Sequence, residues 1–175
     1  ALPPEHTIVV SGYGVVTVIA GILDGTAIIA SEPNQPEQYR LGTDTVQYLN
    51  PPEPIVRLEQ SPWDGSVFIW TRNSLQTVVY SGDTLLPRTV WANTGIEGPN
   101  AACITRYGAY CHSGRRGLAR YRGGTEPDTN FADPVAEYVS SWNPQNTAVG
   151  YDPTIEGVVF CNHQEMLVYF ETIGA

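Results

Sequence analysis

Lysine is absent from this sequence of 175 residues, and all nine basic side chains are arginines. Aspartate and glutamate together number 18, so the formal net charge is −9. A chain with this acidic balance lacks the broad basic surface with which DNA- and RNA-binding proteins neutralise phosphates. The composition therefore disfavours nucleic-acid binding by the molecule as a whole.

Cysteines and long apolar runs are scarce as well. The three cysteines, Cys103, Cys111 and Cys161, are an odd number without CxxC spacing, which supports neither a disulfide framework nor a structural zinc site. We expect them to be small buried hydrophobic residues. No apolar run approaches the roughly 20 residues that a transmembrane helix needs, so no membrane span is expected.

Charged residues are also few, at 15% of the chain, whereas the sequence contains 17 glycines and 14 prolines. Frequent Gly and Pro between short apolar runs are typical of β-structure interrupted by turns. Residues 15–29 predict a first hairpin, with its turn at Asp24-Gly25, and residues 55–81 predict further strands with a turn at Asp64-Gly65. The composition thus predicts an all-β fold.

Two three-stranded meanders follow, at residues 98–124 and 146–171, where short apolar strands alternate with polar turns. A single short helix is expected between them, at residues 135–142. Asp133 would cap this helix, Pro134 would occupy its first position, and Val135, Val139 and Trp142 would share one face.

The hairpins at residues 65–83, 106–124 and 155–174 share one pattern of an apolar strand, a polar turn and a second apolar strand. With the first hairpin they make about four units spaced by roughly 40 residues, the period of a β-propeller blade. The fold predicted is therefore a set of β-propeller-like antiparallel meanders with about four blades, forming a whole or partial propeller. A β-sandwich is the alternative. Residues 1–175 would be a single domain, or a fragment of a larger protein.

Three segments, at residues 65–83, 95–124 and 131–170, also resemble a known family in their amino-acid sequences and in their order along the chain. The strand ending ARYRGG at residues 119–124 is one such feature. The resemblance is to the β-propeller of bacteriophage tail nozzle and connector proteins, although such propellers usually lie inside a longer chain. It implies a non-enzymatic structural protein of the virion tail that is made in the host cytoplasm. This protein would form a homo-oligomer and would also contact other tail proteins around the DNA channel. An acidic channel wall would let viral DNA pass transiently without specific binding.

An enzymatic function is not indicated, because no carboxylate, histidine or glycine-rich pattern has a known catalytic spacing. Asp24, Asp64 and Asp152 each occupy a turn, where aspartate bonds to the local backbone. His163 lies in HQE, which lacks the second histidine of an HExxH zinc helix. We expect no catalytic residue, no metal site and no cofactor.

Two groups of residues are nonetheless candidates for contact with a partner. The candidate interaction surface consists of five arginines that gather in one stretch: Arg106, Arg115, Arg116, Arg120 and Arg122. The other interpretation of these arginines is that they are solvated or paired with the excess of acidic residues. Trp63 and Trp142 are candidate exposed aromatics, and a flat aromatic face can cover the apolar face of a sugar ring. The alternative function is therefore a lectin-like propeller that binds carbohydrate or recognises a host receptor, with a glycan as its ligand.

Overall fold

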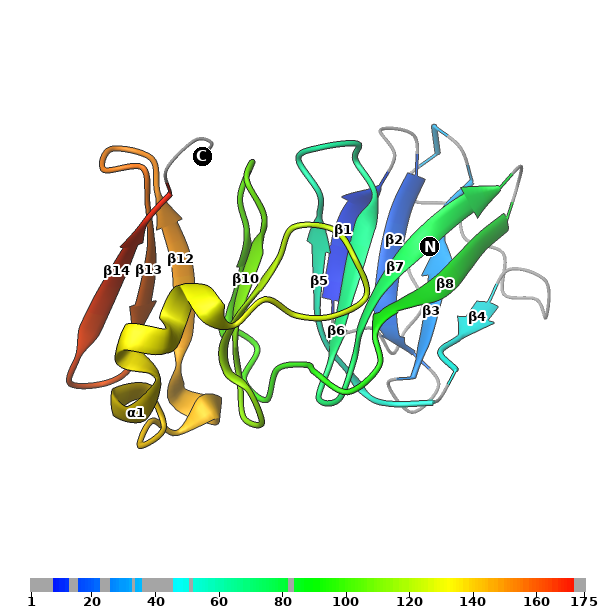
Figure 1. Ribbon diagram of the computed structural model, residues 1–175. Helices are drawn as coiled ribbons and strands as arrows, with labels where there is room; N and C mark the ends of the chain where they lie inside the picture. The colour runs from blue at the N-terminus through cyan, green and yellow to red at the C-terminus, as the bar shows by residue number, and fades with distance from the viewer. Residues whose placement is uncertain are drawn as a thin grey trace.

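The computed structural model describes residues 8–12, 16–22, 26–32, 34–35, 46–50, 52–81 and 84–171. Most of them lie in strands, which form four small antiparallel sheets that follow one another along the chain (Figure 1). Within each sheet the order of the strands is their order in the sequence. The described chain is thus all-β in character and built from meanders, as predicted, and it has four sheets rather than the two of a sandwich.

The first sheet consists of β1 (Ile8–Gly12), β2 (Val16–Ile22), β3 (Ala27–Ala30) and β4 (Val46–Tyr48). β2 and β3 pair antiparallel, which confirms the first predicted hairpin. The turn expected at Asp24-Gly25 lies outside the described residues. β1 and β4 had no counterpart in the prediction.

The second sheet consists of β5 (Ile55–Gln60), β6 (Val67–Thr71), β7 (Leu75–Ser81) and β8 (Thr84–Trp91). The predicted turn between β5 and β6 is confirmed: the Asp64 carboxylate accepts a 2.9 Å hydrogen bond from the Ser66 amide. Gly65 there has a φ of 73°, which glycine adopts without strain. β8 was not predicted because it contains Pro87, which has no backbone N–H to donate. An edge strand tolerates proline, since no neighbouring strand needs that N–H on its outer side.

The third sheet consists of β9 (Ala102–Ile104), β10 (Ala109–Ser113) and β11 (Gly117–Tyr121), and all three strands were predicted. A single bridge extends it, since Arg120 and Asp128 exchange backbone hydrogen bonds of 2.8 and 3.0 Å. Asp128 therefore stands at the position that a fourth strand would occupy.

The fourth sheet consists of β12 (Ala148–Asp152), β13 (Gly157–Cys161) and β14 (Met166–Phe170), again as predicted. Its strands are in continuous register, with each residue of β13 opposite one residue of β12 and one of β14.

The helical segment between the third and fourth sheets differs from the prediction. A 3₁₀ helix, η1 (Asn130–Val135), comes first, and α1 (Ala136–Val139) adds one α-helical turn; a second 3₁₀ turn, η2 (Pro144–Asn146), follows. Asp133 is not the N-cap, because the helical segment begins before it, at Asn130. At that point the Asp128 carboxylate accepts a 3.0 Å hydrogen bond from the Asn130 amide. Val139 and Trp142 are both buried.

Alternating side chains of the central strands pack in opposite directions, so the two middle sheets are buried on both faces. In β6, Ile69 joins a core with Ile28 of the first sheet, whereas Phe68 and Trp70 face the third sheet. All five residues of β6 and all five of β10 are buried. Continuous apolar strands of this kind require cover on both sides.

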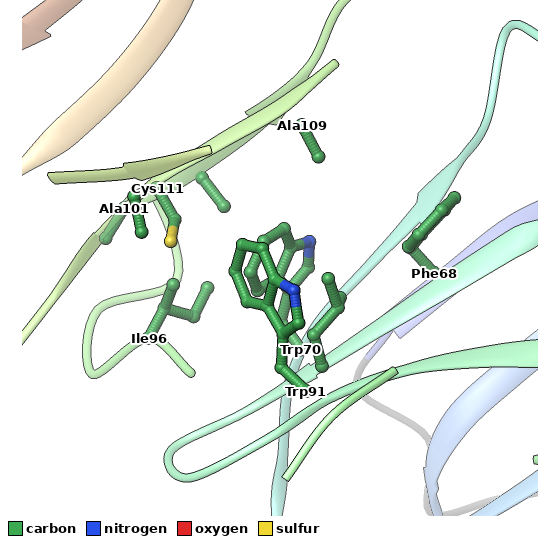
Figure 2. Packing of buried hydrophobic residues seen from close by; sticks show 10 residues of the cluster. Phe68, Trp70, Trp91, Ile96, Ala101, Ala109 and Cys111 are labelled. Atoms are coloured by element: carbon green, nitrogen blue, oxygen red, sulfur yellow. The ribbon is translucent and has the colours of Figure 1, made fainter. Parts of the chain in front are cut away.

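The core between the second and third sheets pairs large side chains with small ones (Figure 2). Trp70 and Trp91 meet edge to face, with ring centroids 6.1 Å apart. The third sheet presents Ala109 and Cys111 to them, and these small side chains leave room for the two indoles. On the other side of β10, Tyr110 packs with Phe160 of the fourth sheet.

The four sheets are arranged in their order along the chain, with the first and the fourth at opposite ends (Figure 1). The first strands of successive sheets contact one another: β1 contacts β5, β5 contacts β9, and β9 contacts β12. A 2.8 Å backbone hydrogen bond from the Val149 amide to the Asn100 carbonyl joins the last two sheets.

Candidate functional site

The five arginines of the predicted interaction surface lie at both ends of the third sheet. Arg115 and Arg116 are exposed in the turn between β10 and β11. Arg106 lies in the turn that precedes β10 and Arg122 directly follows β11, which places both at the opposite end of the sheet. Proximity in sequence thus does not bring the five guanidinium groups together on one surface.

Arg120 is engaged in an internal ion pair. Its Nη2 lies 2.5 Å from Oδ2 of Asp128, its Nη1–H donates to the Tyr169 hydroxyl at 3.0 Å, and its guanidinium lies 5.1 Å from the Phe131 ring centroid. Burial alone would raise the pKa of Asp128, but hydrogen bonds from Arg120 and from the Asn130 amide outweigh it and hold that pKa below its usual value. Arg120 therefore joins the third and fourth sheets instead of offering a free cation.

Arg106 and Trp63 connect turns of neighbouring sheets. The indole N–H of Trp63 donates to the Arg106 carbonyl at 2.8 Å, and the Arg106 guanidinium pairs with exposed Glu156 at 2.9 Å. Trp63 is 42% exposed, as predicted, but its ring also packs edge to face on Phe68 with centroids 5.8 Å apart.

The prediction that Trp142 is exposed is wrong, because only 5% of the residue is accessible. Its ring packs in the core between the third and fourth sheets, and its indole N–H donates to Oε2 of Glu165 at 2.9 Å. The short helical segment turns this residue inward, and the partly exposed Glu165 carboxylate satisfies its one donor.

A pocket of about 350 Å³ lies between the β10–β11 turn and the helical segment. Its polar lining consists of two cations, one carboxylate, one imidazole and hydroxyl groups, and its apolar lining includes Leu118, Val139 and Trp142. These polar side chains belong to Arg115, Arg116, Asp133, His112, Ser113, Thr129 and Ser140. A second cavity of about 270 Å³, lined by Arg72 and Glu97, shares the wall formed by Ser113, Gly114 and Arg115.

His112 is the most deeply buried titratable side chain of this pocket, with 3% of the residue exposed. Its Nδ1 lies 2.7 Å from the Thr147 hydroxyl, and that hydroxyl donates its single hydrogen to the Asn143 carbonyl at 3.1 Å. The hydroxyl can then only accept from His112, which fixes the proton on Nδ1 and leaves Nε2 as an acceptor. Burial lowers the pKa of His112 to about 4, so the ring is neutral at neutral pH.

Nothing in the sequence singled out His112, because no histidine in it has a known catalytic spacing. The signal that could have singled it out is its place in a strand expected to be buried, where an imidazole needs a hydrogen-bond partner. Its partner Thr147 is far away in the sequence, so the pairing could not be deduced from spacing.

A second polar pair, which the sequence did not indicate, lies on β5. The Arg57 guanidinium donates to Oε1 of Glu59 at 2.5 Å and to the Pro99 carbonyl at 2.9 Å. Burial raises the pKa of Glu59 despite the neighbouring Arg57, and burial raises the pKa of the Cys103 thiol to about 12. A thiol with that pKa stays protonated at neutral pH, so Cys103 is a packing residue and not a nucleophile.

The outward side of the fourth sheet is largely apolar, with Asp152 at one edge and Ile155 of the β12–β13 turn beside Gly157. Val158 and Phe160 point toward the third sheet, so strand alternation turns Val159 and Cys161 the other way. Met166, Val168 and Phe170 lie opposite the outward residues of β13, and Met166 and Phe170 are 66% and 60% exposed. We call the outward residues of this sheet the open face: Ala148, Gly150, Asp152, Gly157, Val159, Cys161, Met166, Val168 and Phe170.

Comparison of the sequence with protein-family models and with curated proteins found no match. Within the described ranges, no group of three or more His, Cys, Asp or Glu side chains is placed to hold a metal ion. Among the same residues, no helix has the length and apolar character needed to cross a membrane.

Proposed function

We propose that this protein is a non-enzymatic structural module that assembles with copies of itself through the open face of its fourth sheet. The resemblance of its repeats to phage nozzle and connector proteins supports a place in a bacteriophage tail, beside other tail proteins and around the DNA channel. The observation that carries the proposal is a largely apolar sheet face that leaves Met166 66% and Phe170 60% exposed.

The occupant we propose for the open face is the same face of a second copy. Each sheet face buried in the two middle sheets is covered by another small antiparallel sheet of this chain, and a second copy would extend that packing by one more sheet. The first sheet offers no equivalent partner, because Ala27 and Ile29, which point away from the second sheet, are already buried. A self-complementary contact of one face with itself gives a two-fold dimer.

We also propose that the four sheets are blades of a β-propeller-like array. In a propeller the first strand of each blade lies nearest the common axis, and here the first strands of successive sheets contact one another. A wall of this kind in a protein of net charge −9 would repel the DNA backbone and favour its passage without specific binding.

Light scattering on the purified protein tests the assembly. The wild type should have a mass above the 19.1 kDa of one chain, and Phe170→Glu combined with Met166→Lys should reduce it to the monomer. Leu86→Glu is the matched control, because Leu86 is an exposed apolar residue outside the open face. A monomeric wild type at its highest soluble concentration, or a variant that remains associated, would overturn the proposal.

Carbohydrate binding is the second candidate function, and it rests on the pocket beside His112 and not on exposed tryptophans. The pocket combines hydrogen-bonding groups of both kinds with apolar side chains, as sites for small hydroxylated ligands do. It lies away from the open face, so both functions can belong to the same molecule.

A further inference from the structure

The pocket between the β10–β11 turn and α1 is lined by donors and acceptors whose combination narrows the class of ligand. Its volume of about 350 Å³ lies at the lower end of the range for small-molecule sites, roughly 300–1,000 Å³. One sugar unit is a ligand of suitable size.

Two positive charges lie in the turn that forms one wall. Arg115 and Arg116 are exposed and form no ion pair within the described part of the chain. Gly117 ends this turn with a φ of 70°, so the two arginines sit on a tight turn at the end of a buried hairpin. Their guanidinium groups can donate to an anionic group in the pocket mouth.

Two acceptors among the residues that line the same pocket, one on a buried imidazole and one on an exposed carboxylate, can accept hydrogen bonds from a ligand. The Nε2 of His112 is an acceptor because Nδ1 carries the proton, and no described residue donates to it. The Asp133 carboxylate is a second acceptor that makes no ion pair with a described residue. Simple anions such as acetate would satisfy the arginines but would bring no donor to these two groups.

We propose that this pocket binds a sugar unit that carries a negative charge, with the anionic group on Arg115 and Arg116 and ring hydroxyls donating to His112 and Asp133. Hydroxyl groups supply donors for the two acceptors, and the apolar face of the ring would lie along Leu118 and Val139. This inference rests on the second candidate function, carbohydrate binding, and is independent of assembly.

Isothermal titration with four probes tests the inference: glucuronate, glucose 6-phosphate, glucose and acetate. Glucuronate or glucose 6-phosphate should bind at least tenfold more tightly than glucose or acetate, and the tighter of the two identifies the anionic group as carboxylate or phosphate. In ¹⁵N NMR of the imidazole, the bound sugar should shift the Nε2 signal of His112.

Variants of exposed residues keep the test independent of folding. Arg115→Gln combined with Arg116→Gln should weaken binding of the charged sugar at least tenfold, whereas Arg122→Gln, which changes an exposed arginine at the far end of the same sheet, should leave it unchanged.

The outcomes separate the inference from the function on which it rests. If glucose binds as tightly as the charged sugars, the pocket recognises carbohydrate but the inferred charge preference is overturned. If none of the sugars binds, or acetate binds as well as glucuronate, carbohydrate binding fails together with the inference. An unchanged affinity in the double arginine variant would also overturn it.

Discussion

His112 and Arg120 lie on paired strands of the third sheet, and each holds the fourth sheet in place through a polar contact. His112 bonds to Thr147 directly before β12, and Arg120 bonds to Tyr169 of β14. Both side chains are polar groups at a largely apolar interface, and such groups are destabilising unless they are satisfied.

The burial of His112 predicts a loss of stability in acid. Unfolded histidine binds its proton near pH 6.5, whereas the folded ring does so only near pH 4, so the unfolded state binds more protons between these values. The free energy of unfolding should therefore be fully retained above pH 6.5 and fall as the pH drops toward 4. The shift from 6.5 to about 4 corresponds to at most about 3 kcal/mol.

Urea unfolding followed across this pH range checks the expectation. His112→Gln should reduce the pH dependence between pH 4 and 6.5 while it lowers stability at pH 7. A variant with the same pH dependence as the wild type would show that other groups are responsible.

The ion pair of Arg120 should contribute more to stability than that of Arg106. Arg120→Ala would leave Asp128 without its partner and remove packing on Phe131, with an expected loss of about 1–3 kcal/mol, since Asp128 remains partly solvated. Arg106→Ala removes the same charge from an exposed, solvent-screened pair and should cost clearly less than Arg120→Ala. Chemical denaturation of the two variants compares them, and equal losses would contradict the structural role of Arg120.

The sheets are held together mainly by contacts between faces, and the interface of the second and third sheets contains two fully buried tryptophans. Trp70 and Trp91 from the second sheet occupy the space above Ala109 and Cys111. Large side chains on one sheet and small ones on the other make the packing specific to this pair of sheets.

Removal of one indole from this interface should be costly. Trp91 is fully buried, so Trp91→Ala should lower the free energy of unfolding by about 3–5 kcal/mol. Leu86→Ala on the same strand removes an exposed side chain and should change it by less than about 0.5 kcal/mol. Equal midpoints for the two variants in a denaturant titration would argue against this interface as a principal core.

The sequence predicted most of the elements but little of the candidate site. Turn residues such as Asp64-Gly65 are local signals, so hairpins could be read directly from them. β8 was missed because Pro87 interrupts its pattern, and the short helix was placed too late because the Asp128 turn that begins the segment resembles any loop aspartate. His112, Thr147 and Asp133 come from three separate segments, and only folding brings them to one pocket.

On the scale of the molecule, charge is unevenly distributed within an acidic chain. The exposed pair Arg115 and Arg116 lies at one end of the third sheet, whereas the net charge is −9. Two cations can bind a small anion locally, but they cannot overcome long-range repulsion of a polyanion.

The protein should accordingly fail to retain double-stranded DNA. In an electrophoretic mobility assay at low ionic strength, where attraction to phosphates is strongest, we expect no shifted band. A shift that disappears with added salt would reveal a cationic surface that the net charge conceals, and it would contradict the proposal that DNA passes without binding.

The meander order has a consequence for how the chain reaches its fold. Every strand pair of the four described sheets joins strands adjacent in the sequence, so each pairing closes only a short loop. A topology rich in such local pairings has a low contact order, and it should fold faster than a sandwich of the same size. Each sheet can also complete its hydrogen bonds before the next one is synthesised, and the emerging chain can add its sheets in order during translation.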